Sequence, residues 1–296
     1  MKILNFGSIN YDHVYTVPYI VRPGETLEST SVQEFIGGKG FNQSIALSRA
    51  GVPVYHAGAV GLDGGNALDA LSDNGVDIGY IAKTETQTGK AIIQVSEDGQ
   101  NSIILSGGAN QCISIGQIDR TLENFTRGDI LLLQNEISNV GYIIKKAHDI
   151  GMKVFLNPSP YHESLSDHLC KVDLLFINEV EGMQITGSND PDLILDKISS
   201  QYPDMRIVLT LGPDGVAYRH GAQTHRHGIF KGSVIDTTAA GDTFTGHFIG
   251  AQIRGEHVTE ALKQASAASS LAISASGAYP SIPTIAEVMR RVEGDW

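Results

Sequence analysis

Short apolar runs of strand length alternate with helix-like segments along most of this 296-residue chain, from about Gly40 onward. The clearest strand-like runs are 130–133, 153–156, 174–177 and 207–211. A helical pattern from Val140 to His148 separates the first two. Such alternation predicts βαβ units and therefore an α/β fold, a doubly wound, mostly parallel sheet flanked by helices. Ligands of these sheets bind beyond the carboxyl ends of the strands, so polar residues after each strand are the candidate site residues.

Two early segments interrupt this alternation and contain no helical pattern. Residues 13–36 read as two strands joined around Pro23-Gly24, and residues 90–105 as two more joined around Asp98-Gly99, a strong hairpin signal. Together they predict a small β-sheet that projects from the α/β body and serves as a lid, a dimer surface or both. No repeat, low-complexity tract or linker divides the sequence, so residues 1–296 are expected to form a single domain.

Charge and cysteine content argue against several classes of protein. The formal charge of −12 disfavours a general nucleic-acid binder, which needs a basic surface. Cys112 and Cys170 are too few for a disulfide framework and lack the spacing of a zinc site, so both are predicted to be buried apolar residues. We expect a cytoplasmic protein, because the first residues lack a signal-peptide core and no apolar run is long enough to span a bilayer.

The most specific pattern lies at the start of a predicted helix that ends near Gly255. After a strand-like stretch, the small residues Ala239, Ala240 and Gly241 would expose backbone N–H groups at the positive end of the helix dipole. Such groups form a pocket for a transferring phosphoryl group. Asp242 then stands in the first turn, where its carboxylate can reach a hydroxyl beside that pocket. Taken alone, Asp242 is equally well explained as an acidic residue that stabilises a helix N-terminus.

Residues 236–244, Asp-Thr-Thr-Ala-Ala-Gly-Asp-Thr-Phe, resemble the C-terminal signature of the ribokinase-like (PfkB) carbohydrate kinases. Residues 37–43 resemble the N-terminal signature, and residues 178–181 match the Asn-x-x-Glu motif of that family. The other segments that match, in family order, are 7–12, 107–110, 134–136 and 210–212. This resemblance covers essentially the whole chain. It implies an enzyme that transfers the γ-phosphate of ATP, with Mg²⁺, to a primary sugar hydroxyl, with D-ribose as the first choice of substrate and ribose 5-phosphate as product.

The resemblance also implies roles for individual residues. Asp242 would be the base, with Ala239, Ala240 and Gly241 around the phosphoryl group. The implied sugar contacts are Asn10 and Asp12 at the end of the first strand, Gly38, Lys39 and Asn42 at the start of the next helix, and Glu136. The implied nucleotide contacts are Asn178 at the phosphates, Thr210, Gly212 and Gly241, with Glu181 organising Mg²⁺ through water. A site for a monovalent cation such as K⁺, built largely of backbone carbonyls, is implied at Asp236, Thr238, Ala272, Ala275, Gly277 and Ser281.

Other features are less specific. The resemblance implies a homodimer formed through the small sheet. Gly277 is also expected to cap the long helix that precedes it. Some members of the family carry a histidine near the adenine, and residues 263–266 have none, so the adenine contacts stay open. Three neighbouring histidines could bind a metal but are more simply explained as solvated: His220, His225 and His227.

Two alternative functions remain at this point. The chain could be a kinase for another sugar or for a nucleoside, which the residues of the small sheet would decide. It could also be a non-catalytic protein that senses a sugar or a nucleotide on the same fold. The intact Asp242 and its anion-binding turn argue against the second alternative, because a protein that only binds its ligand needs no base.

Overall fold

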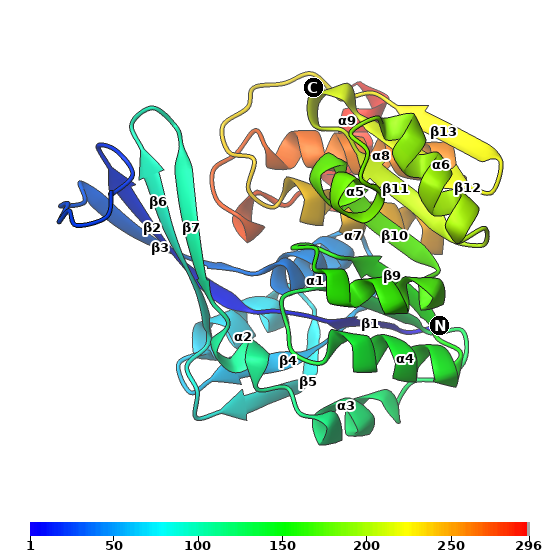
Figure 1. Cartoon of the computed structure of the whole chain (residues 1–296), viewed down its shortest axis with the longest axis horizontal. Helices are drawn as coiled ribbons and strands as arrows, with labels where there is room; N and C mark the ends of the chain where they lie inside the picture. Colours follow the sequence, from blue (N-terminus) through cyan, green and yellow to red (C-terminus); the bar gives the residue numbers. More distant parts are fainter. Residues whose placement is uncertain (295–296) are drawn as a thin grey trace.

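The computed structural model describes residues 1–294 and is built around one large sheet (Figure 1). Its nine strands run in the order β13-β12-β11-β10-β9-β8-β1-β4-β5. In that order they are Gln223–His227, Val216–His220, Arg206–Thr210, Leu174–Asn178, Lys153–Asn157, Ile130–Gln134, Ile3–Phe6, Tyr55–Gly61 and Asp77–Thr84. Neighbours from β11 to β5 pair in parallel, whereas β12 and β13 are antiparallel additions at one edge. The predicted mostly parallel sheet is confirmed.

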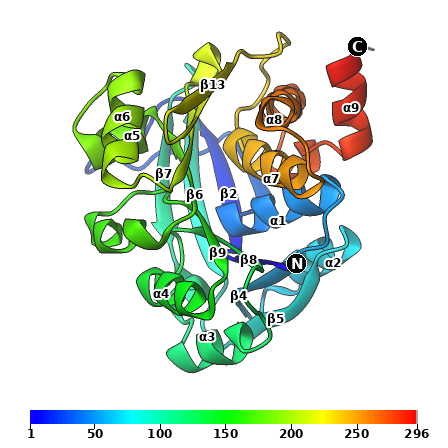
Figure 2. The same cartoon turned by 90° about the vertical axis from the view of Figure 1, so that its right-hand side faces the viewer.

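Helices cover both faces of this sheet, as Figure 2 shows. On one face lie α1 (Lys39–Arg49), α2 (Gly65–Asp73), α7 (Ala240–Ile253) and α8 (Val258–Ala272), with α9 (Ile285–Glu293) packed outside α8. On the other lie α3 (Ile115–Leu122), α4 (Val140–Ile150), α5 (Glu179–Thr186) and α6 (Pro191–Gln201). An apolar core fills each interface. Strands buried on both faces are continuous apolar runs, which is why β8 to β11 were readable from sequence.

A second sheet of four strands projects from the body (Figure 1). Its order is β3 (Ser31–Gly37), β2 (Asn10–Val17), β6 (Gly89–Ser96) and β7 (Asn101–Ser106). The hairpin around Asp98-Gly99 is confirmed. The first hairpin has a longer connection than predicted, because Pro18 follows Val17 directly and cannot donate to the ladder. We call these four strands the small sheet.

Helices α1 and α7 cross at close range. A Cβ added to Gly246 would lie 2.4 Å from the Cβ of Ala46, and one added to Gly250 would lie 2.7 Å from that of Ala50. Only glycine at these two positions permits such an approach. The crossing brings the first turn of α7 beside the first turn of α1.

Three expectations are wrong. Cys112 and Cys170 are exposed, because they lie in surface segments at the end of the 3₁₀ helix Gly108–Gln111 and within Glu163–Lys171. The strand predicted directly before α7 does not form: residues 228–239, between β13 and α7, are a loop in which Val234 is 65% exposed and pairs with no strand of residues 1–294. Gly277 does not cap α8, which ends at Ala272; it takes a left-handed φ of 91° in the loop beyond.

No helix within residues 1–294 has both the length and the apolar character that crossing a bilayer requires.

Candidate active site

Two adjoining cavities lie where β10 and β11 end and α7 begins. The smaller has a volume of about 240 Å³ and the larger of about 680 Å³. Both are lined by Thr210, Thr237, Ala240 and Gly241, so the start of α7 stands between them. The position follows the rule that ligands bind beyond the carboxyl ends of parallel strands.

The turn into α7 carries unpaired donors. Ala239 adopts a left-handed conformation, with a φ of 60°, which is unusual for a residue with a Cβ. Within residues 1–294, the N–H groups of Gly241 and Asp242 find no acceptor, whereas that of Ala240 donates weakly to the carbonyl oxygen of Thr237, at 3.3 Å. The predicted exposure of N–H groups therefore holds at Gly241. These N–H groups lie at the positive end of the helix dipole, where they can bind an anion.

Asp242 stands in the first turn of α7 and is 8% exposed. Its Oδ2 accepts a hydrogen bond from Asn42 Nδ2 at 3.1 Å, and its Oδ1 accepts one from Gln43 Nε2 at 2.8 Å. Burial raises the pKa of Asp242 to about 6, against the opposing effect of the Lys39 ammonium and these two amide donors. A carboxylate with this pKa is still ionised near neutral pH and is a better proton acceptor than an exposed aspartate.

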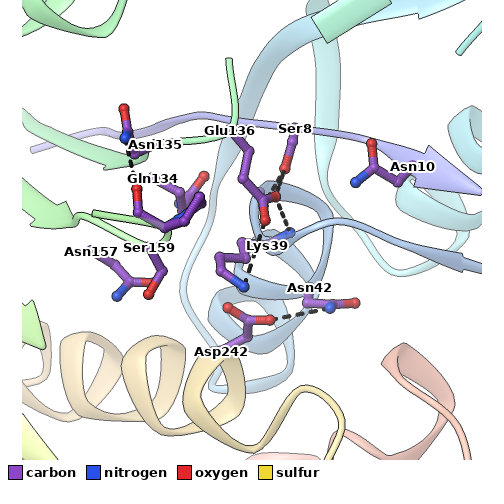
Figure 3. A network of polar contacts seen from close by, with 12 residues as sticks. Ser8, Asn10, Lys39, Asn42, Gln134, Asn135, Glu136, Asn157, Ser159 and Asp242 are labelled. Carbon is purple, nitrogen blue, oxygen red and sulfur yellow. Dashed lines mark hydrogen bonds and ion pairs between the residues drawn. The ribbon is translucent and has the colours of Figure 1, made fainter. Parts of the chain in front are cut away.

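Lys39 and Glu136 form a charged pair beside Asp242 (Figure 3). Lys39 Nζ lies 3.5 Å from Glu136 Oε1, and the backbone N–H of Lys39 donates to Oε2 at 3.0 Å. Ser8 Oγ donates to the same Oε2 at 2.5 Å. Burial alone would lower the pKa of Lys39, but the carboxylates of Glu136 and Asp242 raise it, so the ammonium stays charged. Lys39 also lines the smaller cavity, where its charge faces any bound phosphate.

From the sequence, Asn10 and Asp12 are expected at the end of the first strand. They lie instead in β2 of the small sheet. Asn10 Oδ1 accepts a hydrogen bond from Asn110 Nδ2 at 2.8 Å, which fixes the orientation of its amide. Asp12 lies against β3, where a Cβ on Gly37 would fall 2.1 Å from its Oδ2. Burial, followed by the charge of Glu136, raises the pKa of Asp12 to about 6. The small sheet thus contributes a carboxylate close to Glu136, Lys39 and Asp242.

Asn178 and Glu181 both line the smaller cavity, at the carboxyl end of β10. They form a capping box on α5: Asn178 Oδ1 accepts from the N–H of Glu181 at 3.0 Å, and Glu181 Oε2 accepts from the N–H of Asn178 at 2.8 Å. The hydroxyl of Ser159 donates to the other Glu181 oxygen. Both carboxylate oxygens retain a lone pair for water or a cation.

Within the described chain, no three His, Cys, Asp or Glu side chains gather into a group that could hold a metal. The histidines near β13 form no such group either. His225 packs against Tyr218 and His257, and His227 stacks on Phe230.

The loop before α7 meets the segment after α8. The carboxylate of Asp236 accepts hydrogen bonds from the N–H and hydroxyl of Thr238 and from the N–H of Gly277, at 2.9, 2.6 and 3.0 Å. Although burial raises the pKa of Asp236, these hydrogen bonds outweigh it and hold the pKa below its ordinary value. An ionised carboxylate in an oxygen-rich loop suits a hard cation. Of the other predicted ligands, Ser281 turns its hydroxyl to the carbonyl of Ala278.

The larger cavity is mostly apolar and extends from α7 toward α8 and the loop 228–239. Val216, Phe244 and Ile229 contribute apolar surface, and Ser266 stands on α8 within the stretch that lacks a histidine. The predicted nucleotide residues Thr210 and Gly212 line the same cavity. Its size and apolar lining suit a nucleobase.

Sequence reasoning missed several polar residues of the site. Asn157 is the last residue of β9 and Ser159 follows it, and both line the smaller cavity, where the strand-end rule should have indicated them. Gln43 and Ser8 lie in the matching segments 37–43 and 7–12, but the resemblance implies no role for either. Their roles depend on which elements fold together, which a linear pattern does not show.

The family model described as pfkB family carbohydrate kinase matches residues 1–285. The chain belongs to this family. The ribokinase of Haemophilus influenzae is 37% identical over 300 residues, which cover 97% of this chain and 97% of that protein.

Two solved structures of family members match the fold. The ribokinase of Arabidopsis thaliana, complexed with ribose and ATP, superposes with a TM-score of 0.87 at 30% identity, covering 99% of this chain and 98% of that one. The ribokinase of Cryptococcus neoformans, in complex with ADP, gives a TM-score of 0.85 at 31% identity, covering 98% of this chain and 99% of that one. The resemblance inferred from sequence motifs is confirmed.

Proposed function

We propose that this pfkB-family protein is an ATP-dependent kinase that converts D-ribose to ribose 5-phosphate. The observation that carries the proposal is the buried carboxylate of Asp242, held in the first turn of α7 beside the N–H group of Gly241, which has no acceptor within residues 1–294. A base next to an anion-binding helix start is the arrangement that phosphoryl transfer to a hydroxyl requires. Similarity to ribokinases over nearly the whole chain supports ribose as the acceptor.

The two cavities suggest how ATP would bind. The adenosine part of ATP would occupy the larger cavity, and its phosphates would enter the smaller one, past Thr210 and the start of α7. Lys39 and the N–H groups of Gly241 and Asp242 would neutralise charge on the transferring group. Asn178 and Glu181 line the same cavity and would contact the β- and γ-phosphates and, through water, Mg²⁺. Magnesium, when bound, supplies charge neutralisation on the phosphate oxygens.

The acceptor would bind between the small sheet and α1. Asp12, Asn10 and Asn42 would contact its hydroxyls, together with Gly38, Lys39 and Glu136 at the rim. Asn42 Oδ1 is buried and has no hydrogen-bond partner within residues 1–294, so it can accept from a sugar hydroxyl. The 5-hydroxyl would give its proton to Asp242 as its oxygen forms a bond to the γ-phosphorus, while the bond from that phosphorus to the β-phosphate oxygen breaks and ADP leaves.

Two further features belong to this proposal. Potassium would bind near Asp236, Thr238 and Gly277, where an ionised carboxylate lies close to the anion-binding turn. The family's other matching positions, Ala272, Ala275 and Ser281, would add carbonyl or hydroxyl oxygens.

A homodimer would form through the small sheet. Its outer strands leave large apolar side chains uncovered: Val32, Ile103 and Leu105 are each 54% exposed, and Ile104 is 59% exposed. Ile104 and Val32 share one face of the sheet, whereas Ile103 and Leu105 share the face of Asp12. Pairing two copies about a two-fold axis would bury the face of Ile104 and leave that of Asp12 over the sugar.

Acceptor specificity is the test. ADP release is measured with ATP and a panel of ribose, 2-deoxyribose, fructose and adenosine. Ribose should give the highest kcat/KM. A large preference for fructose or adenosine would support kinase activity but exclude ribose as the preferred acceptor. No turnover with any acceptor would favour a non-catalytic binding protein.

A further inference from the structure

We propose that Gln43 is a positioning residue that holds the carboxylate of Asp242 in place for proton transfer, an inference that rests on the proposed function. Its side-chain amide contacts three residues from three different elements. Nε2 donates to Asp242 Oδ1 at 2.8 Å and to Asn157 Oδ1 at 3.1 Å, and Oε1 accepts from Gln134 Nε2 at 2.6 Å. Helix α7, strand β9 and strand β8 thus meet on one side chain of α1.

The contacts of its neighbours fix which way the Gln43 amide points. Gln134 Nε2 donates to Gln43 Oε1 and also to Asn5 Oδ1, the latter at 2.9 Å. Because Gln134 presents its N–H₂ group on this side, the side-chain carbonyl of Gln43 must face Gln134. On the other side, Asn157 Nδ2 donates to the carbonyl oxygen of Phe176 at 3.1 Å, which leaves Asn157 Oδ1 facing Gln43. A flipped Gln43 amide would set its oxygen against the oxygens of Asp242 and Asn157. Only this orientation of the Gln43 amide sets a donor against Asp242 Oδ1 and Asn157 Oδ1 and an acceptor against Gln134 Nε2.

The chain of hydrogen bonds continues into the core beneath α1. Asn5 Nδ2 donates to the carbonyl oxygen of Gly40 at 2.7 Å and to Ser44 Oγ at 2.8 Å, and Ser44 Oγ lies 2.7 Å from His56 Nδ1. Burial lowers the pKa of His56 to about 4, so its ring is neutral at working pH.

This chain ends at the base. Asn5, Gln43, Ser44 and His56 are 0% exposed and Gln134 is 1% exposed, so water does not compete for their hydrogen bonds. The members from His56 to Gln43 are neutral, and the last N–H of the chain meets the ionised carboxylate of Asp242. A charge-assisted hydrogen bond of this kind both fixes the rotation of the carboxylate and favours its ionised form. Asn42 holds the other oxygen, and it belongs to the proposed sugar pocket, whereas Gln43 reaches Asp242 from the core.

The experiment compares Gln43→Met with a matched control, Gln117→Met. Methionine approximates the length of glutamine but cannot donate a hydrogen bond. Gln117 lies on α3 at the other face of the sheet, where its Nε2 donates to the carbonyl oxygen of Gly58 at 2.7 Å. The dependence of kcat on pH is measured with saturating ribose and ATP, and the KM for ribose is measured at pH 7.5.

For Gln43→Met we expect kcat at pH 7 to fall about 10-fold and the acid limb of the kcat profile to move up by about one pH unit, with the KM for ribose changed less than twofold. Gln117→Met should match the wild type in all three. If folded Gln43→Met keeps the acid limb of the wild-type kcat profile, or if only its KM for ribose changes, Gln43 does not position Asp242. In that case the proposed function still stands, provided that the wild-type protein phosphorylates ribose.

A second variant guards against misfolding. If Gln43→Met does not bind ADP, the test passes to Gln134→Met, which keeps Gln43 but frees its carbonyl. We expect an upward displacement of the acid limb by about half a pH unit. An unchanged limb in this variant would show that the buried chain does not act on the base.

Discussion

Replacing Asp242 with asparagine tests the base directly, and the structure makes two opposite predictions for it. Asparagine preserves the size of the side chain but cannot accept the proton of the sugar hydroxyl. A general base contributes on the order of 10²- to 10⁴-fold to turnover, so kcat should fall by that amount while ribose and ADP still bind. The same change should stabilise the fold, for an electrostatic reason.

The stability effect follows from the pKa of Asp242, which burial raises from 3.8 to about 6. The folded protein therefore binds this proton more tightly than the unfolded chain, so the ionised carboxylate destabilises the fold above pH 6. At about 1.4 kcal/mol per pH unit, the difference amounts to as much as about 3 kcal/mol at pH 8, and it vanishes as the pH falls toward 4. Asp242→Asn should recover part of this free energy of unfolding at pH 8 and little at pH 4.5.

The assay couples ADP release to NADH oxidation for kcat, and urea unfolding at pH 8 and pH 4.5 gives the stability. Asp129→Asn is the matched control, because Asp129 is also buried, 6% exposed, but directly precedes β8, at the amino end of that strand and far from the carboxyl ends that form the site. It accepts hydrogen bonds from the N–H groups of Lys2 and Thr126, so this variant should lose stability and keep kcat. A variant of Asp242 that retains more than a tenth of wild-type kcat would remove this residue from the role of base.

Four further outcomes are expected. Asp12→Ala should raise the KM for ribose by about 10- to 100-fold, through loss of charge-assisted hydrogen bonds, and steady-state kinetics that show an unchanged KM would exclude Asp12 from the pocket. Potassium should activate more than sodium at fixed Mg²⁺ and ionic strength, and Asp236→Ala should abolish the difference; equal rates in both salts for the wild type would argue against the site. Ile104→Lys should convert a dimer to a monomer in sedimentation velocity, and a wild-type monomer at micromolar concentration would contradict the interface. Gly246→Ala should lower the free energy of unfolding by about 1–3 kcal/mol in urea titrations, because its Cβ would overlap Ala46; an unaltered midpoint would show that the helices separate freely.

The sequence predicted the sheet well where strands are buried on both faces. The runs near residues 130, 153, 174 and 207 became β8, β9, β10 and β11 with no boundary shifted by more than one residue. Prediction failed where local composition does not decide the environment. Val234 belongs to an apolar stretch that finds no strand to pair with, and Cys112 and Cys170 sit in surface 3₁₀ segments that hydrophobicity alone does not indicate.

The candidate site was predictable in its parts and less so in its connections. The small residues before Asp242 predict exposed N–H groups at the helix start, and within residues 1–294 those of Gly241 and Asp242 have no acceptor. The position of Asn10 and Asp12 on the small sheet was not predicted, because the chain leaves β1 and enters β2 within a few residues and no turn signal marks the change. The buried links from Gln43 to Gln134 and Asn5 join residues 43, 134 and 5, and such a link is visible only after folding.

The division between the small sheet and the α/β body has a consequence for how such an enzyme can be altered. In the proposed site, the groups that choose the acceptor come in part from β2, whereas the base and the phosphate-binding turn belong to α7. Part of the acceptor recognition and the catalytic base therefore lie on different elements, β2 and α7, which can be mutated independently. Exchanging residues 10–17 and 89–96 for those of a family member with another acceptor would redirect the enzyme without touching its catalytic helix. In this architecture, new specificities can evolve through strand replacement while the reaction is conserved.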